Sequence, residues 1–143
     1  MCGIAGFWSN SNDNNGDWLE KVASNMANTL QHRGPDDNGT WVDPEVGIAF
    51  GHRRLSIIDI TDAGHQPMIS KDGRYVISYN GEIYNFQELR TQLEKLGHQF
   101  LGHSDTEVML SSFVQWGVGP SLERFNGMFA FAIWERRDRH LWI

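Results

Sequence analysis

Cys2 is the only cysteine of the 143-residue chain, and its position suits nucleophilic catalysis. Removal of Met1 would leave a thiol and a free α-amino group on the same residue. An α-amine with a pKa of roughly 7.7 to 8.0 is partly unprotonated near neutral pH, so it could accept the thiol proton directly or through one water. The alternative is a small buried side chain, which is the more frequent role of a lone cysteine.

Asn80 and Gly81 follow an expected strand over residues 74–79 and could stabilise an oxyanion. Asn-Gly ordinarily predicts a hairpin turn, but the residues that follow have helical periodicity instead of a returning strand. A side-chain amide and a backbone N–H at the end of a strand are two donors that can converge on one oxygen. Acyl transfer requires this arrangement, and a glycine permits close approach.

Arg53 and Arg54 are adjacent within an otherwise apolar stretch that predicts a strand over residues 46–60. Successive side chains of a strand point to opposite faces, so we expect one arginine in solvent and the other facing a pocket. A buried guanidinium needs a carboxylate, which either the protein or a ligand can supply. An amino-acid substrate would bring one, whereas an internal salt bridge is the alternative.

Periodicity and turn residues predict the elements that must position these side chains. A buried strand over residues 4–8 would hold the N-terminus in place, whereas ordinary termini fray. Asp17 is the expected N-cap of the first helix, residues 85–88 form an expected capping box, and Leu96 lies on the apolar face of the second helix. The other expected elements are a helix at 17–30, a structured turn at 31–39, strands at 40–42 and 98–101, a loop at 61–68, helices at 86–96, 105–116 and 120–125, and strands at 128–134 and 141–143.

Composition indicates a single globular domain and excludes several classes of function. A net charge of −6 and scattered lysines and arginines argue against nucleic-acid binding. One cysteine excludes an intrachain disulfide, and no apolar stretch approaches the roughly 20 residues of a membrane span, so a cytoplasmic protein is expected. The six histidines lack a paired ligand spacing, so no metal site is expected.

Seven sequence blocks, in this order, resemble the class II glutamine amidotransferases of the N-terminal-nucleophile hydrolase superfamily. Within that family they are similar to the glutaminase domain of glutamine-dependent asparagine synthetases. The blocks are Met-Cys-Gly-Ile-Ala-Gly, His-Arg-Gly-Pro-Asp-Asp, Arg-Leu-Ser-Ile-Ile-Asp, Gly-His-Gln-Pro-Met, Tyr-Asn-Gly-Glu-Ile-Tyr-Asn, Ser-Asp-Thr-Glu-Val and Phe-Asn-Gly-Met-Phe-Ala-Phe-Ala-Ile-Trp. The resemblance implies an α+β fold over residues 1–143, an αββα sandwich of two antiparallel sheets between helical layers. Since the sequence stops inside an expected strand, we expect it to be incomplete at its C-terminus.

The resemblance also implies a reaction, hydrolysis of L-glutamine to glutamate and ammonia through a Cys2 thioester. Asn80 and Gly81 would stabilise the oxyanion, and the turn that contains His32 would border the glutamine pocket. The implied substrate-binding residues are Arg54 for the α-carboxylate, Glu82 and Asp105 for the α-ammonium, and Leu55 and Ile57 for the pocket wall. Without the resemblance, Ser104 and Glu107 cap a helix and Asp105 only complements its dipole.

Family resemblance implies partners as well. A synthetase domain, absent from this sequence, would bind ATP, Mg²⁺ and the ammonia acceptor, and the glutaminase domain itself would need no cofactor. The acceptor, whether aspartate, a sugar or a peptide, stays open, and so does the oligomeric state, a dimer included. Two alternatives remain, an inactive regulatory or interaction domain of the same fold and an amidase of this superfamily that acts on a different amide.

Overall fold

The computed structural model describes residues 1–10, 15–57 and 61–143. Two antiparallel sheets face each other, one with the strand order β1-β3-β2 and the other with the order β4-β5-β6-β7. The elements are β1 (Gly3–Trp8), α1 (Gly16–Asn28), β2 (Asp37–Asp43), β3 (Ile48–Arg54), η1 (Asp62–Gly64), β4 (Met68–Ile69), β5 (Tyr75–Ile83), α2 (Phe86–Lys95), α3 (Asp105–Trp116), α4 (Val118–Leu122), β6 (Gly127–Glu135) and β7 (His140–Trp142).

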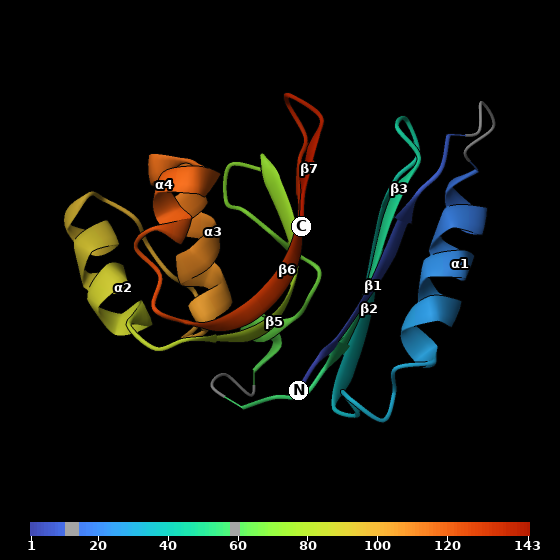
Figure 1. The fold of residues 1–143 in the computed structure, drawn as a ribbon, viewed down its shortest axis with the longest axis horizontal. Helices are drawn as coiled ribbons and strands as arrows, with labels where there is room; N and C mark the ends of the chain where they lie inside the picture. Colours follow the sequence, from blue (N-terminus) through green and yellow to red (C-terminus); the bar gives the residue numbers. More distant parts are fainter. Residues whose placement is uncertain (11–14, 58–60) are drawn as a thin grey trace.

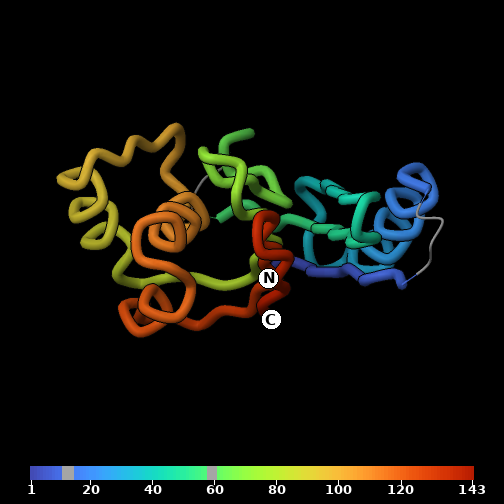
Figure 2. Tube along the Cα trace, turned by 90° about the horizontal axis from the view of Figure 1, so that it is seen from above, coloured from blue at the N-terminus to red at the C-terminus, as the bar shows by residue number. Residues whose placement is uncertain are grey.

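Helices cover the outer faces of both sheets, which confirms the predicted αββα sandwich. Helix α1 lies along the three-stranded sheet, whereas α2, α3 and α4 lie on the opposite side of the molecule, beyond the four-stranded sheet (Figure 1). Viewed from above, the two halves of the chain occupy opposite ends of the molecule and meet where the sheets face each other (Figure 2). No helix among the described residues has the length and apolarity needed to cross a membrane.

Successive side chains of β1 and β3 point alternately toward helix α1 and toward the four-stranded sheet. Phe7 and Ala49 pack with Leu19 of α1 on the outer face of the sheet. Ile48 belongs to the inner face, where it packs in a second cluster with Phe50, Val76 and Trp134. The side chains of β3 at even positions therefore point toward the other sheet, and this face includes His52 and Arg54.

The third cluster lies between the four-stranded sheet and its helices. Tyr75, Ile77 and Tyr79 come from one face of β5 and pack with α3 residues such as Met109 and Phe113. The opposite face of β5 carries Val76, Ser78 and Asn80 toward the first sheet. Two helical layers and two sheets thus leave one interlayer space in which residues from both sheets can meet.

One predicted strand is shorter than expected, and another is absent. The strand expected over residues 46–60 ends at Arg54, and residues 58–60 lie outside the described part of the chain. It ends there because the next two backbone amides donate to side chains instead of to a neighbouring strand. Leu55 N–H donates to Cys2 Sγ at 3.3 Å, and Ser56 N–H donates to Asp36 Oδ2 at 2.8 Å. The strand predicted at 98–101 is absent, because Leu101 N–H and Gly102 N–H donate to the Glu107 carboxylate at 2.9 and 2.8 Å.

Helix termini were also predicted with mixed success. Ser104 caps α3 as expected, since its Oγ accepts from Glu107 N–H. The N-cap of α1 is Asn15 instead of Asp17, and its side chain accepts from two backbone amides. Asn85 makes no capping bond and instead fastens α2 to residues 124 and 126. Leu96 lies beyond the last turn of α2 and is 55% exposed.

Candidate active site

A pocket of about 240 Å³ collects every predicted site residue from four separate segments of the chain. It lies where β1 begins, β3 ends, β5 passes and α3 begins. The predicted residues that line it are Cys2, Arg54, Leu55, Ile57, Asn80, Gly81, Glu82 and Asp105. The structure thus brings these residues together, and their individual roles stay predictions.

Cys2 lies at the start of β1 and is half-buried in the pocket wall. Its Sγ accepts a hydrogen bond from Leu55 N–H at 3.3 Å and lies 3.7 Å from Leu55 O. Its own carbonyl accepts from Arg33 Nε at 3.1 Å, which anchors the Cys2 backbone. Met1 precedes it, lines the same pocket and is 73% exposed, which leaves it accessible to removal.

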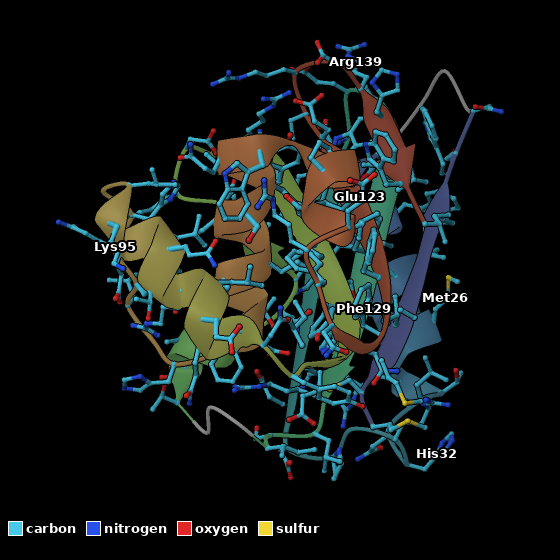
Figure 3. The ribbon with its side chains drawn as sticks, turned by 60° about the vertical axis from the view of Figure 1, so that its left-hand side comes forward. Met26, His32, Lys95, Glu123, Phe129 and Arg139 are labelled. Atoms are coloured by element: carbon cyan, nitrogen blue, oxygen red, sulfur yellow. The ribbon has the colours of Figure 1, made fainter. Side chains whose placement is uncertain are left out.

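The turn that contains His32 contributes no residue to the pocket lining, so the expectation that it borders the pocket is wrong. His32 is exposed and lies at the periphery of the molecule (Figure 3). Asp36 N–H donates to Arg54 O at 3.0 Å, and Asp36 Oδ2 accepts from Ser56 N–H at 2.8 Å. The turn therefore fixes the end of β3, from which Arg54 reaches the pocket.

Both adjacent arginines are buried, so the expectation that one lies in solvent is wrong. Arg53 is 6% exposed and Arg54 is 7% exposed, on opposite faces of β3. Arg53 Nε donates to Gly34 O at 2.9 Å, so a backbone carbonyl of the preceding turn accepts its hydrogen bond. Arg54 Nη1 donates to Thr61 O at 2.9 Å, and its guanidinium lines the pocket.

The segment from Thr61 to Gln66 packs against the Arg54 guanidinium, a role that no pattern in the sequence had assigned to it. A Cβ on Gly64 would overlap the Arg54 guanidinium. His65 Nδ1 lies 2.8 Å from Asp37 Oδ2 and ties the segment to β2. The Gly-His-Gln-Pro-Met block could have pointed to this role, because its glycine, Gly64, and its glutamine, Gln66, both line the pocket.

Asn80 and Gly81 lie inside β5, which extends to Ile83, so the expectation of a strand end at residue 79 is wrong. Glycine is required at position 81, where φ is 156° and a Cβ would overlap Met128 O and the Cα of Phe129. Since β4 pairs only with Ile77 and Val76, no strand among the described residues lies along the edge of β5 beyond them.

The amides along this edge are oriented by the alternation of an antiparallel strand. Tyr79 N–H donates to Gln66 Oε1 at 2.6 Å, and Ile83 N–H donates to Asp105 Oδ2 at 3.0 Å. Gly81 is two residues from each, so its N–H points to the same edge and toward the pocket. Asn80 and Gly81 both line the pocket, and a side-chain amide together with a backbone N–H is the donor pair that an oxyanion site requires.

Asp105 is the first residue of α3 and is 4% exposed. Its Oδ2 accepts from the Tyr79 hydroxyl at 2.7 Å and from Ile83 N–H. Burial raises the pKa of the Asp105 carboxyl above its usual range, while these hydrogen bonds act in the opposite direction. Glu82 is exposed at the rim of the pocket, so the two carboxyl groups have different environments.

Metal-ligating side chains do not cluster in the part of the chain that the structure describes, where no three of His, Cys, Asp or Glu gather. The residues around Cys2 instead combine a free thiol, a pair of amide donors and charged groups of both signs. A small zwitterion with an amide group fits this set chemically, because a carboxylate matches a guanidinium and an ammonium matches carboxylates.

The family is decided by a model of the glutamine amidotransferase domain, which matches residues 1–143. The chain belongs to this family. The amidotransferase domain is 41% identical over 96% of its length to asparagine synthetase (glutamine-hydrolyzing) 3 of Bacillus subtilis and 34% identical to a putative asparagine synthetase 2 of Methanocaldococcus jannaschii. It spans 22% of the length of the first of these relatives and 28% of the second.

A solved structure has the same fold as this amidotransferase domain. Glutamine phosphoribosylpyrophosphate amidotransferase from Bacillus subtilis, in complex with ADP and GMP, superposes with a TM-score of 0.71 over 94% of the domain and 34% of that chain. At 22% identity the likeness shows the fold alone. The predicted α+β fold, with two antiparallel sheets between helical layers, is thereby confirmed.

Proposed function

We propose that the chain hydrolyses L-glutamine to glutamate and ammonia, with Cys2 as the nucleophile. The α-amine of Cys2, free after removal of Met1, accepts the thiol proton while sulfur attacks the carbon of the side-chain amide. Asn80 Nδ2 and Gly81 N–H donate to the tetrahedral oxyanion. The C–N bond then breaks, and ammonia leaves with the proton. Water hydrolyses the γ-glutamyl thioester, which releases glutamate and restores the thiol.

The observation that carries this proposal is the meeting of Cys2, Arg54, the edge of β5 and Asp105 in one pocket. Arg54 would bind the α-carboxylate, and Glu82 and Asp105 would accept from the α-ammonium, which orients the side-chain amide toward the sulfur. Leu55 would form the wall beside Cys2, since its backbone contacts Sγ, and Ile57 would complete the wall at the pocket rim. A zwitterion with a carboxamide matches these groups together, whereas a simple amide would bring neither a carboxylate nor an ammonium to them.

We further propose that the ammonia serves a synthetase domain in the parent protein. Support comes from the relatives, which are named glutamine-hydrolyzing asparagine synthetases and are several times longer than this chain. In that setting ATP and Mg²⁺ would bind outside the glutaminase domain, which would need no cofactor, and the protein would act in the cytoplasm. Aspartate is the acceptor that the relatives' names favour.

Ammonia release from glutamine tests the proposal directly. The wild-type protein should release ammonia, and its mass and N-terminal sequence should show Cys2 as the first residue. Cys2→Ala should abolish release and also labelling by a glutamine-like electrophile, while leaving the unfolding temperature nearly unchanged. A lysine inserted between Met1 and Cys2, which blocks removal of the initiator, is the matched control. It keeps the thiol but denies it a free amine, so full activity of that variant would contradict the mechanism.

A further inference from the structure

Tyr79 is a buried tyrosine whose hydroxyl and backbone both serve the pocket. Its side chain is 2% exposed and belongs to the core between β5 and the helices. Its hydroxyl leaves that core and donates to Asp105 Oδ2 at 2.7 Å. The sequence drew attention to the Asn80-Gly81 pair that follows it, and gave Tyr79 no role.

The hydroxyl of Tyr79 stabilises the buried carboxyl group of Asp105. Asp105 is almost fully buried, and a carboxylate loses its hydration there unless donors replace water. Tyr79 and Ile83 N–H both converge on Oδ2, which fixes the carboxyl group in one orientation. Hydrogen bonds to the charged form favour ionisation, so the Tyr79 hydroxyl opposes the rise in the Asp105 pKa that burial causes.

The backbone of Tyr79 reaches the opposite side of the pocket. Its N–H donates to Gln66 Oε1 at 2.6 Å, so it is joined to the segment that packs against the Arg54 guanidinium. Tyr79 thereby contacts both the carboxylate proposed for the substrate ammonium and the support of the arginine proposed for the substrate carboxylate. Its two contacts link the Asp105 carboxylate to the segment that packs beside the Arg54 guanidinium.

We propose that Tyr79 is a positioning residue for substrate binding, whose hydroxyl holds the Asp105 carboxylate toward the α-ammonium of glutamine. This inference rests on the proposed function, because it assumes that glutamine occupies the pocket. Tyr79 itself touches neither the amide carbon nor the sulfur in the mechanism. Its effect therefore falls on glutamine binding, through Asp105.

Substitution Tyr79→Phe removes the hydroxyl and keeps the ring. Loss of a hydrogen bond to a charged group corresponds to a rise in the KM for glutamine of about tenfold, with kcat changed less than twofold. Without this donor the carboxyl group protonates more readily, so the acid limb of kcat/KM should move to higher pH. Cys2, the α-amine, Arg54 and Glu82 also face the pocket, but the substitution leaves them in place.

Tyr75→Phe is the matched control, because Tyr75 lies on the same face of the same strand and is also 2% exposed. Tyr75 does not belong to the pocket lining. This variant should keep the wild-type KM and pH profile. Thermal unfolding of both variants shows whether either change acts through the stability of the fold.

Glutaramic acid, which is glutamine without its α-amino group, separates positioning from a general structural role. If Tyr79 acts through Asp105, Tyr79→Phe should lower kcat/KM for glutamine about tenfold and leave kcat/KM for glutaramic acid unchanged. An equal loss for both substrates, an unchanged KM for glutamine, or the same loss in Tyr75→Phe would overturn the inference.

Calorimetry with Cys2→Ala distinguishes a failure of this inference from a failure of the proposed function. If glutamine binds that variant and Tyr79→Phe weakens binding about tenfold, the inference holds even where the wild-type protein releases no ammonia. Absence of ammonia release would then contradict only the hydrolysis. If glutamine does not bind at all, both the proposed function and the inference are wrong.

Discussion

Two neighbouring arginines show how the same side chain acquires different roles from its position alone. Arg53 and Arg54 are equally buried, yet alternation along β3 sends one toward the turn behind the site and the other into the pocket. Arg53 is bound to Gly34 O, whereas Arg54 is flanked by Thr61 O and Gly64. Only the second guanidinium can meet a carboxylate that enters the pocket.

Arg54→Lys should therefore raise the KM for glutamine about tenfold or more and lower kcat much less. Lysine keeps the charge but cannot bind a carboxylate through two parallel N–H groups, and a contact made equally in the ground and transition states affects KM. Steady-state ammonia release measures both constants. Arg53→Lys is the control, with an unchanged KM and a lower unfolding temperature. Equal KM values for Arg54→Lys and the wild-type protein would refute the assignment of Arg54.

At the scale of elements, the segment from Thr61 to Gln66 is as important to the site as any strand. Thr61 O and Gly64 form two sides of the space that the Arg54 guanidinium occupies. The segment is itself held by the contacts of His65 with Asp37 and of Gln66 with Tyr79. Its conformation thus sets the position of a charge that belongs to another element.

Gly64→Ala tests this role by steric overlap. The φ of Gly64 is not in the left-handed region, so its backbone accepts alanine, but the new methyl group would overlap the Arg54 guanidinium. We expect the KM for glutamine to rise about tenfold, with a loss of stability of about 1 to 3 kcal/mol from overpacking. Gly119→Ala is the control, since a Cβ there meets no atom within 4 Å. Matching KM values for the two variants would argue against the role of Gly64.

Some elements were predictable from sequence because their signals are local. The Ser104 cap and the apolar stripe of α3 follow from residues close in the chain. The extension of β5 through Gly81 was not predictable, since it depends on the close approach of Phe129 from β6. Likewise, residues 98–101 form no strand because Glu107 supplies the acceptors that a neighbouring strand would have offered.

Site residues were predictable by motif, but not their surroundings. The resemblance identified Asp105, and the structure then placed it in the pocket lining. It could not show that Tyr79 donates to that carboxylate, because the two residues are 26 positions apart and the tyrosine reads as a core residue. Burial of Arg53 was missed for a similar reason, since its acceptor is a backbone carbonyl of a distant turn.

The whole molecule places the pocket at one end of the space between its two sheets. At the other end Trp8 packs edge-on against Trp134, with 5.4 Å between ring centroids, and the interlayer core is apolar. Toward the pocket the side chains of β3 become polar, first His52 and then Arg54. The apolar end fixes the distance between the sheets, so residues of both sheets can meet at the polar end.

His52, which lies in this interlayer space, makes the stability of the fold depend on pH. It is fully buried, its Nδ1 lies 2.9 Å from Ser78 Oγ, and its Nε2 has no partner among the described residues. Burial lowers the pKa of His52 to about 4 from a usual value of 6.5. His52 therefore binds a proton below pH 6.5 in the unfolded chain, but only below about pH 4 in the folded chain. The free energy of unfolding falls as the pH decreases through this window.

His52→Gln should flatten the dependence of stability on pH between 6.5 and 4. The histidine contribution lost across this window is on the order of 3 kcal/mol. Asp105 affects stability with the opposite sign, because its raised pKa lets the folded state bind a proton at higher pH than the unfolded state does. The wild-type protein and His52→Gln both keep Asp105, so its contribution cancels between them. The difference between their urea unfolding free energies at pH 7.5, 5.5 and 4.5 thus isolates His52. A difference that stays constant across the three pH values would show that His52 does not resist protonation in the folded state.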